Sequence, residues 1–275
     1  MRPATAARRP VGQRLVTWAL GLLCGLVFVA LYAPIILVAV LSFFRLRRGR
    51  IQWDSFSVEW YGKLLGNEQI ATALANSLVV GFFAVLTSLV VASLLAVYAD
   101  QHGGRRAAVL QFIVFLPFLL PPIISGLAML IFFKEIGVPR GLVTVTVGHS
   151  VFVLALVYRT ILTRLQALNR NMIDASYDLG ATRLQTFRYV LLPNLKLAIV
   201  TAALLAFALS FDETMITLFL IGDSNTLPVR LYAMMRVGFT PEINALVTLI
   251  LLFSTVLTLV IARFVGRGGG ERFAL

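Results

Sequence analysis

Two adjacent acids, Asp212 and Glu213, interrupt the apolar run LSFDETMITLF. An acid near the centre of a bilayer costs roughly 2.5–3.5 kcal/mol on insertion scales, so such groups generally face a polar cavity or a partner. The pair could form a negative wall that attracts a cation and repels an anion. Because successive helical residues point about 100° apart, one acid would line the path while the other pairs with a neighbouring helix or subunit. The alternative is that nearby Ser, Thr or Arg side chains satisfy both acids, which then have a structural role only.

Enzymatic chemistry finds little support elsewhere in the sequence. The two histidines, His102 and His149, lie on different segments, and the single Cys24 lies in an apolar run, where packing is its expected role. The only Gly-Lys pair, Gly62-Lys63, is followed by leucine, so the phosphate loop of P-loop ATPases is missing. We therefore expect no catalytic residue, no metal and no cofactor bound by this chain. Any ATP that drives it must be hydrolysed by a separate chain.

A polar stretch, DASYDLGATRLQTFRYVLLP from Asp174 to Pro193, separates two long apolar segments. It predicts two short helices joined by a hinge. Asn171 can cap the first helix, with Asp174 three residues further on. Gly180 follows at the position where a helix end favours a left-handed residue.

The second short helix is predicted to begin at Thr182, with Gln185 completing a capping box. Pro193 suits the first turn of the following membrane helix and would mark a junction. A helix–glycine–helix element outside the bilayer, with an apolar stripe, suits docking onto another protein. The stripe would consist of three residues at helical spacing, Leu184, Phe187 and Leu191.

The composition is that of an integral membrane protein. Of 275 residues, 59% are hydrophobic and 13% charged, and the mean hydropathy is +0.91, whereas soluble domains are nearer half apolar and a quarter charged. The net charge of +12 comes mostly from residues between apolar runs, as topology signals do. We therefore expect contact with lipid and no binding of nucleic acid.

Windows without charge locate six predicted transmembrane helices, since a span needs about 20 apolar residues. Runs of this length exclude barrel strands, so the predicted class is an all-α integral membrane protein. The third window contains Pro117, Pro121 and Pro122, which must kink or break its helix. The windows lie between Arg14 and Arg45, Glu68 and Asp100, Arg106 and Lys134, Arg140 and Arg159, from about 198 to 221, and between Glu242 and Arg263. The fifth of them is interrupted by Asp212 and Glu213.

Placement of Lys and Arg favours cytoplasmic termini, with 15 of the 24 on the inner side. Five in the first outer loop run against this rule. Trp53, Trp60 and Tyr61 in that loop predict a short surface helix at the headgroup level. The predicted divisions are a cytoplasmic tail 1–14, a first helix 15–44, a periplasmic loop 45–70, a core 71–262 with a cytoplasmic loop 160–196, and a cytoplasmic tail 263–275.

The polar stretch resembles the cytoplasmic loop of permease subunits of binding-protein-dependent ABC importers. That pattern is Glu-Ala-Ala, three residues, Gly, and about nine residues to a hydrophobic-x-Leu-Pro. Here Asp replaces the Glu, Ser replaces the second Ala, and a proline often found after the Leu-Pro pair is absent. The resemblance implies that the coupling to an ATPase is carried by the matching residues, Asp174, Ala175, Ser176, Gly180, Leu192 and Pro193, with Val190 at the hydrophobic position.

Longer strings narrow the likeness to the spermidine/putrescine-type permeases, and to their second permease subunit. These strings are SFDETMITLFL, TLPVRLYAMMRVGFTPEINAL, WDSFSVEWYGKLL and ALANSL. The resemblance implies a type I ABC importer permease fold in a bacterial inner membrane. It also implies three kinds of partner, namely a second permease, two ATPase subunits and a periplasmic or external binding protein. Asp212 and Glu213 would then lie on the path of a polyamine or a related small cation.

Two other functions remain open from the residues. An ion-coupled secondary transporter could use Asp212 or Glu213 as a proton or sodium carrier, although it would usually need inverted repeats and paired broken helices, neither of which the sequence indicates. A purely structural membrane subunit would have no need of the two acids.

Overall fold

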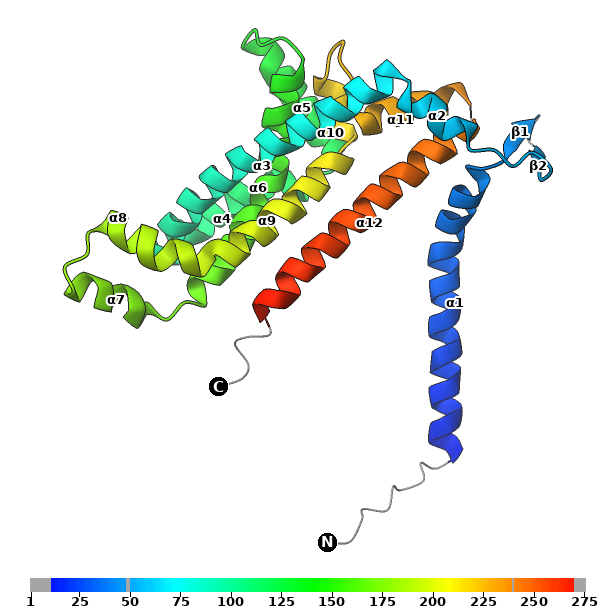
Figure 1. The fold of residues 1–275 in the computed structure, drawn as a ribbon. Coiled ribbons are helices and arrows are strands. Elements are labelled where there is room, and N and C mark those ends of the chain that lie inside the picture. The colour runs from blue at the N-terminus through cyan, green and yellow to red at the C-terminus, as the bar shows by residue number, and fades with distance from the viewer. Residues whose placement is uncertain (1–10, 48–49, 239, 270–275) are drawn as a thin grey trace. The chain divides into compact units, whose positions relative to one another are not determined.

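The computed structural model describes residues 11–47, 50–238 and 240–269, most of them helical (Figure 1). Contacts divide the chain into two compact units, Met1–Leu64 with Phe239–Leu251 and Leu65–Gly238 with Leu252–Leu275. The elements are α1 Val11–Leu41, β1 Arg45–Arg47, β2 Arg50–Gln52, α2 Glu59–Leu65, α3 Glu68–His102, α4 Gly104–Leu119, α5 Pro122–Glu135, α6 Leu142–Gln166, α7 Arg170–Asp178, α8 Arg183–Thr186, the π-helical turn η1 Phe187–Leu191, α9 Leu192–Asp212, α10 Met215–Leu220, α11 Leu227–Val237 and α12 Pro241–Gly269.

Five helical stretches of the described chain are long and apolar enough to cross a bilayer. The pair α4 and α5 provides a sixth span if the two helices are counted together, with a bend of 103° between them. The predicted six-helix membrane class therefore agrees with the structure. The five stretches are Val16–Leu41, Glu68–His102, Leu142–Gln166, Arg183–Asp212 and Pro241–Val260.

The third span is broken at its prolines. Leu120 and Pro121 each precede a proline, and both have extended backbone, with ψ of 143° and 134°. A proline ring excludes the helical conformation from the residue before it, so two successive prolines separate α4 from α5. Ser125 Oγ donates to the Pro117 carbonyl at 3.2 Å, which provides a partner for a backbone oxygen near the break.

The core of the second unit forms where α3, α6 and α9 pack together (Figure 1). Helix α6 is central, with 56% of its most apolar window buried against 22% for the span that ends in α9. Buried alanines such as Ala92, Ala96 and Ala202 let the helices approach closely. In this unit α7 and α8 lie at one end of the bundle, and α5, α10 and α11 lie at the opposite end (Figure 1).

In the first unit, α1 is exposed along its entire apolar window. Cys24 is exposed on it, so the predicted packing role is wrong within this chain. The predicted first helix 15–44 ends at Leu41, because the chain turns at Ser42, which is buried and bonded through Oγ to the Tyr61 hydroxyl at 2.6 Å. Of the predicted tails, 1–10 and 270–275 lie outside the described residues, whereas 11–14 belong to α1 and 263–269 belong to α12.

The first outer loop contains the expected short helix, α2, and also a hairpin that the sequence did not indicate. In the hairpin β1 pairs antiparallel with β2, and Leu46 lies opposite Ile51. Glu59 of α2 forms ion pairs with Arg45 at 3.2 Å and with Lys63 at 2.6 Å. The aromatic side chains of this loop contact one another, with Phe43 stacked on Phe56 at a centroid distance of 5.5 Å.

Candidate functional site

The first short helix begins two residues earlier than predicted. Helix α7 starts at Arg170, and its cap is Asn169, whose side-chain oxygen accepts from the Asn171 N–H at 3.0 Å. The prediction that Asn171 caps the helix is therefore wrong, because two asparagines lie within reach and the earlier one has the extended backbone of a cap.

Gly180 ends α7 as predicted. Its φ is +81°, and two backbone bonds close the turn: Gly180 N–H to the Tyr177 carbonyl at 2.8 Å and Ala181 N–H to the Ser176 carbonyl at 3.0 Å. This pair of bonds is the Schellman motif, which satisfies the last carbonyls of a helix and favours glycine. An added Cβ at Gly180 would meet open space, so the backbone conformation alone favours glycine here.

The second half of the element has the predicted capping box. Thr182 Oγ1 accepts from the Gln185 N–H at 3.3 Å, and Gln185 Oε1 accepts from the Thr182 N–H at 2.8 Å. The two halves are joined by hydroxyls, since Ser176 Oγ lies 2.9 Å from Oγ1 of the buried Thr186. Because Ser176 also donates to the Ile173 carbonyl at 2.7 Å, it can accept the Thr186 proton.

Pro193 lies in the first turn of α9, as predicted. The helix nevertheless runs on without a break, so the predicted junction between the second short helix and the membrane span is wrong. Helix α8 continues through η1 into α9, and the Leu192 N–H reaches the Phe187 carbonyl in a wider, π-helical turn. Proline has no N–H to donate, and a widened turn accommodates its ring within a continuous helix. Asn194 Nδ2 donates to the Val190 carbonyl at 2.8 Å and supplies a bond next to Pro193.

The predicted coupling residues lie on an open surface. Ser176 is half-buried, and the exposed members are Asp174, Ala175, Gly180, Leu192 and Pro193. The predicted apolar stripe does not stay on one face: Leu184 is 74% exposed, whereas Leu191 packs against the core. The π-helical turn changes the helical phase between them. Exposed apolar side chains, led by Leu179 at 89%, therefore cover the free side of the element.

Two polar contacts tie this element to the bundle. Arg170 pairs with Asp100 at the end of α3 at 3.3 Å. Arg164 Nε, at the end of α6, donates to the Asn194 carbonyl at 3.2 Å. A displacement of α7 and α8 therefore reaches α3 and α6 as well as α9.

The two acids lie at a break in the fifth span. Helix α9 ends at Asp212, and Glu213 has extended backbone with ψ of 113° before α10 begins at Met215. The assumption of a continuous helix at the acids is therefore wrong. Asp212 is exposed and forms no side-chain hydrogen bond or ion pair with the described residues, whereas Glu213 is half-buried and its Oε1 accepts from the Ile216 N–H at 3.0 Å.

Both ends of α10 are satisfied by polar groups. Glu213 caps the amino end, where a carboxylate also favours the helix dipole. At the other end the Leu220 carbonyl accepts from the Gly141 N–H at 2.8 Å and from Thr144 Oγ1 at 3.0 Å. The short helix is thereby held at a fixed position in the bundle.

Glycines allow α10 to lie close to its neighbours. A Cβ at Gly148 of α6 would lie 2.8 Å from Leu220 Cδ1 and 2.9 Å from Ile216 Cγ2, and one at Gly126 of α5 would lie 3.1 Å from the Ile216 Cα. Real Cβ atoms essentially never approach another atom within 3.0 Å, and 3.1 Å is tighter than nine in ten of their contacts, so the neighbouring atoms would have to move. The two glycines therefore set how α5 and α6 approach α10.

Sequence reasoning missed the histidine next to Gly148. His149 is 1% exposed, and its ring bonds Ser210 Oγ through Nδ1 and Thr217 Oγ1 through Nε2, both at 2.8 Å. The two hydroxyls lie on opposite sides of the break in the fifth span. A polar side chain in a window without charge was the available signal, because such a group must find a partner in the bundle.

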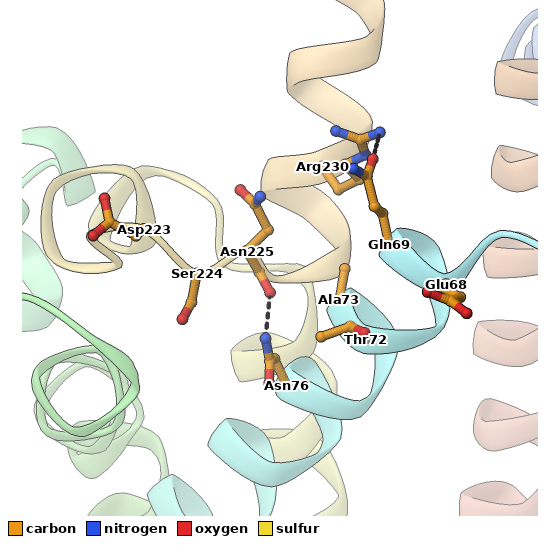
Figure 2. Close-up of a pocket in the computed structure, with 9 residues that line it drawn as sticks. All are labelled: Glu68, Gln69, Thr72, Ala73, Asn76, Asp223, Ser224, Asn225 and Arg230. Atoms are coloured by element: carbon orange, nitrogen blue, oxygen red, sulfur yellow. Dashed lines mark hydrogen bonds between the residues drawn. The ribbon is translucent and has the colours of Figure 1, made fainter.

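A polar cavity of about 400 Å³ lies at the end of the second unit opposite α7. Figure 2 shows the Asn76 side chain donating to the Asn225 carbonyl, at 2.9 Å, and Arg230 bonded to Gln69. The two acids of its lining, Glu68 and Asp223, lie apart on opposite sides of the cavity in Figure 2. The cavity therefore joins the start of α3 to the loop before α11, and its acids do not converge on a common point.

Comparison with known proteins identifies similar chains. The family model described as binding-protein-dependent transport system inner membrane component matches residues 88–268. The spermidine/putrescine transport system permease protein PotC of Shigella flexneri is 32% identical over 248 residues, which make up 89% of this chain and 94% of that protein. The putrescine transport system permease protein PotI of Escherichia coli K12 is 35% identical over 232 residues, or 82% of each chain.

Solved structures share the fold. A chain of a bacterial ABC transporter involved in the import of the acidic polysaccharide alginate has a TM-score of 0.72 at 17% identity, and covers 94% of this chain and 99% of its own. A chain of the MetNI methionine ABC transporter in an inward-facing conformation has a TM-score of 0.60 at 23% identity, covering 77% and 99%. The expected type I permease fold of ABC importers is therefore confirmed.

Proposed function

We propose that this chain, which belongs to the family of binding-protein-dependent transport system inner membrane components, is the permease subunit of an ATP-driven importer. Its proposed cargo is a polyamine such as spermidine or putrescine, or a related small cationic amino compound. The observation that carries this proposal is the likeness to PotC across 89% of this chain and 94% of that protein. The family places the chain among inner-membrane transport components.

The proposed assembly contains a second permease, two ATPase subunits and an external binding protein. The exposed face of α7 and α8 supports docking of an ATPase, because Leu179 and Leu184 lie uncovered beside a rigid glycine turn. The termini would be cytoplasmic, as the distribution of Lys and Arg favours. The opposite end, with α5, α10 and α11, would then face the binding protein.

The proposed cation path uses the two acids unequally. Asp212 is the exposed acid without a side-chain partner among the described residues, and we assign it the contact with the cation. Glu213 already caps α10 through the Ile216 N–H. Its role is to hold the break at which Asp212 lies.

The secondary-transporter alternative is not favoured by the comparisons, since the family and the similar solved structures are those of ABC importers. One sequence-based objection to it was nevertheless wrong. Broken helices are present, at the α4–α5 bend of 103° and between α9 and α10.

The test of the proposed function is reconstitution of the permease pair with and without the ATPase subunits in vesicles. Uptake of labelled spermidine should require the ATPase subunits and ATP on the side of the membrane to which those subunits bind. Uptake by the permeases alone, driven by a proton or sodium gradient, would favour the alternative. Strong competition by a neutral sugar and none by putrescine would show that the cargo is not a polyamine.

The coupling role is tested at Gly180. Gly180→Val forces a β-branched residue to a φ of +81°, which costs about 1–2 kcal/mol, and should separate ATP hydrolysis from uptake in an assembled complex. Gly180→Asn, which tolerates this conformation, should retain most uptake. Gly137→Val is the matched control, because Gly137 has a φ of +73° and open space around its Cβ position but lies at the end of α5. Equal uptake by all three variants would contradict the coupling role.

A further inference from the structure

The buried ring of His149 connects two helices that the chain itself has separated. Ser210 lies in the last turn of α9 and Thr217 in α10, and both hydroxyls lie 2.8 Å from the ring nitrogens. Between them Glu213 and Thr214 belong to neither helix, and Glu213 has extended backbone. The histidine therefore spans the break from the neighbouring helix α6.

The hydrogen-bond network fixes which way each bond runs. Thr217 Oγ1 donates its single proton to the Glu213 carbonyl at 2.9 Å, so toward the ring it accepts, and the ring hydrogen lies on Nε2. In the neutral ring Nδ1 then accepts from the Ser210 hydroxyl. A continuous chain of bonds runs from Ser210 through His149 and Thr217 to the backbone of Glu213.

The surrounding packing leaves this arrangement little freedom. Gly148, next to His149, contacts α10 so closely that even a methyl group would collide with Leu220 and Ile216. Thr144, on the same helix, binds the Leu220 carbonyl at the far end of α10 at 3.0 Å. Helix α6 thus holds both ends of α10 and the last turn of α9.

We propose that His149 is a positioning residue that holds the break in the fifth span open at a fixed angle and thereby sets where the Asp212 carboxylate points. The inference rests on the proposed function for its consequence in transport, since Asp212 is the acid assigned to the cation. The geometry itself does not depend on the cargo, so the bridge is testable without transport.

The first experiment measures where position 212 lies. In the assembled complex, Cys24→Ser removes the single cysteine, and Asp212→Cys introduces a thiol whose modification rate by a small cationic thiosulfonate is recorded. Thr217→Val removes one bridging hydroxyl at similar volume, and Ser210→Ala removes the other. Each should change the rate by about fivefold or more, as expected for the loss of one buried hydrogen bond.

Two matched variants distinguish the loss of the His149 bridge from a non-specific effect of substitution on the helices. Thr217→Ser keeps the hydroxyl and should restore the parent rate within about twofold. Thr160→Val deletes a hydroxyl on α6 whose one bond among the described residues is to the Leu156 carbonyl of the same helix, at 2.8 Å, and it should leave the rate unchanged. His149→Leu combined with Thr217→Val should have no larger effect than His149→Leu alone, because His149→Leu already removes the bond to Thr217. Rates unchanged in Thr217→Val, Ser210→Ala and His149→Leu would overturn the bridge.

The second experiment separates this inference from the proposed function. With Asp212 intact, Thr217→Val should raise the half-saturation concentration for spermidine several-fold, while ATP hydrolysis and the maximal uptake rate stay near those of Thr160→Val. If the labelling rate at position 212 changes but spermidine uptake does not, the bridge stands and the role of Asp212 in polyamine transport fails. If the labelling rate does not change, the bridge fails whatever the transport result.

Discussion

Gly180 and Gly148 lie beside the two interruptions of helical structure on which the proposals depend, and they are glycines for different reasons. Gly180 has a left-handed backbone with open space around its Cβ position, and the bonds that close its turn join residues no more than five apart. Gly148 has ordinary helical backbone, and its missing side chain lets Leu220, 72 residues later in the sequence, approach it. One interruption is held by local bonds and the other by tertiary packing.

The two regions also differ in how each would move during transport. The proposed coupling element, which consists of α7, the turn at Gly180 and α8, presents exposed apolar residues, and its hydrogen bonds are satisfied internally. Such an element suits a rigid-body movement driven by a bound partner. The break in the fifth span has an exposed Asp212 and a half-buried Glu213, and it leads into α10, which contacts both α5 and α6. Its geometry therefore changes only when those helices move.

The largest expected effect is at the packed glycine. Gly148→Ala places a methyl group within 2.9 Å of Ile216 and Leu220 and should lower the free energy of unfolding by about 1–3 kcal/mol, as overpacking does. Thermal unfolding of the purified complex measures it. Gly62→Ala is the control, since it lies on α2 with no atom within 4 Å of its Cβ position. Equal unfolding temperatures for both variants would show that close packing against α10 does not require a glycine at position 148.

The next effect separates the two acids. Asp212→Asn should raise the half-saturation concentration for spermidine about tenfold, because loss of one charge contact near a protein surface exceeds about 1.4 kcal/mol. Glu213→Gln keeps an oxygen that can accept from the Ile216 N–H and should have a much smaller effect. Concentration-dependent uptake in vesicles measures both. A larger effect for Glu213→Gln would reverse the assignment of the two acids.

A smaller effect is expected within the coupling element. Ser176→Ala removes the hydroxyl that contacts Thr186 at 2.9 Å, and should cost about 0.5–1.5 kcal/mol of stability. Because this bond is what joins α7 to α8 across Gly180, the number of ATP molecules hydrolysed per spermidine imported should rise. The control is Ser57→Ala, in a loop of the other unit, where Ser57 Oγ accepts from the Glu59 N–H at 3.1 Å and forms no other bond with the described residues. An unchanged stoichiometry would show that the hydroxyl pair does not stiffen the element.

The smallest effect is expected in the surface helix α2, which belongs to neither region and serves as a reference for both. Hydrogen bonding and charge attraction from Lys63, and then the charge of Arg45, lower the pKa of Glu59 below its ordinary value of 4.5. A lowered folded-state pKa contributes stability that is present above pH 4.5 and is lost as the pH falls through the lowered pKa. The unfolding temperature should therefore stay constant from pH 7 to 5, then fall slightly more than in Glu59→Gln, and less so in high salt.

Much of the coupling element could be predicted from the sequence. The left-handed glycine at position 180 and the capping box of Thr182 with Gln185 were both confirmed, because caps and turns depend on side chains within a few residues. The same reasoning placed the cap at Asn171 and a junction at Pro193, and both were wrong. Two candidate caps in one turn, and a helix able to widen around a proline, are resolved only by the backbone that forms.

The broken fifth span could be predicted only in part. Its acids were visible as charges in an apolar run, but their separate roles depend on where Ile216 and the rest of α10 lie. His149 was visible only as a polar residue, since its partners are 61 and 68 residues away. The hairpin of β1 and β2 went unpredicted because charge-free windows carry no information on loops.

The sequence by itself determined the membrane class, the number of apolar spans and the position of the coupling element, because hydropathy, charge and helix capping act over short stretches of chain. The tertiary structure alone decided that Glu213 caps α10 while Asp212 stays exposed. It also decided that His149 of α6 bridges the break between α9 and α10. Those outcomes depend on close approach of α5, α6 and α10, which glycines permit and which no local pattern of residues can specify.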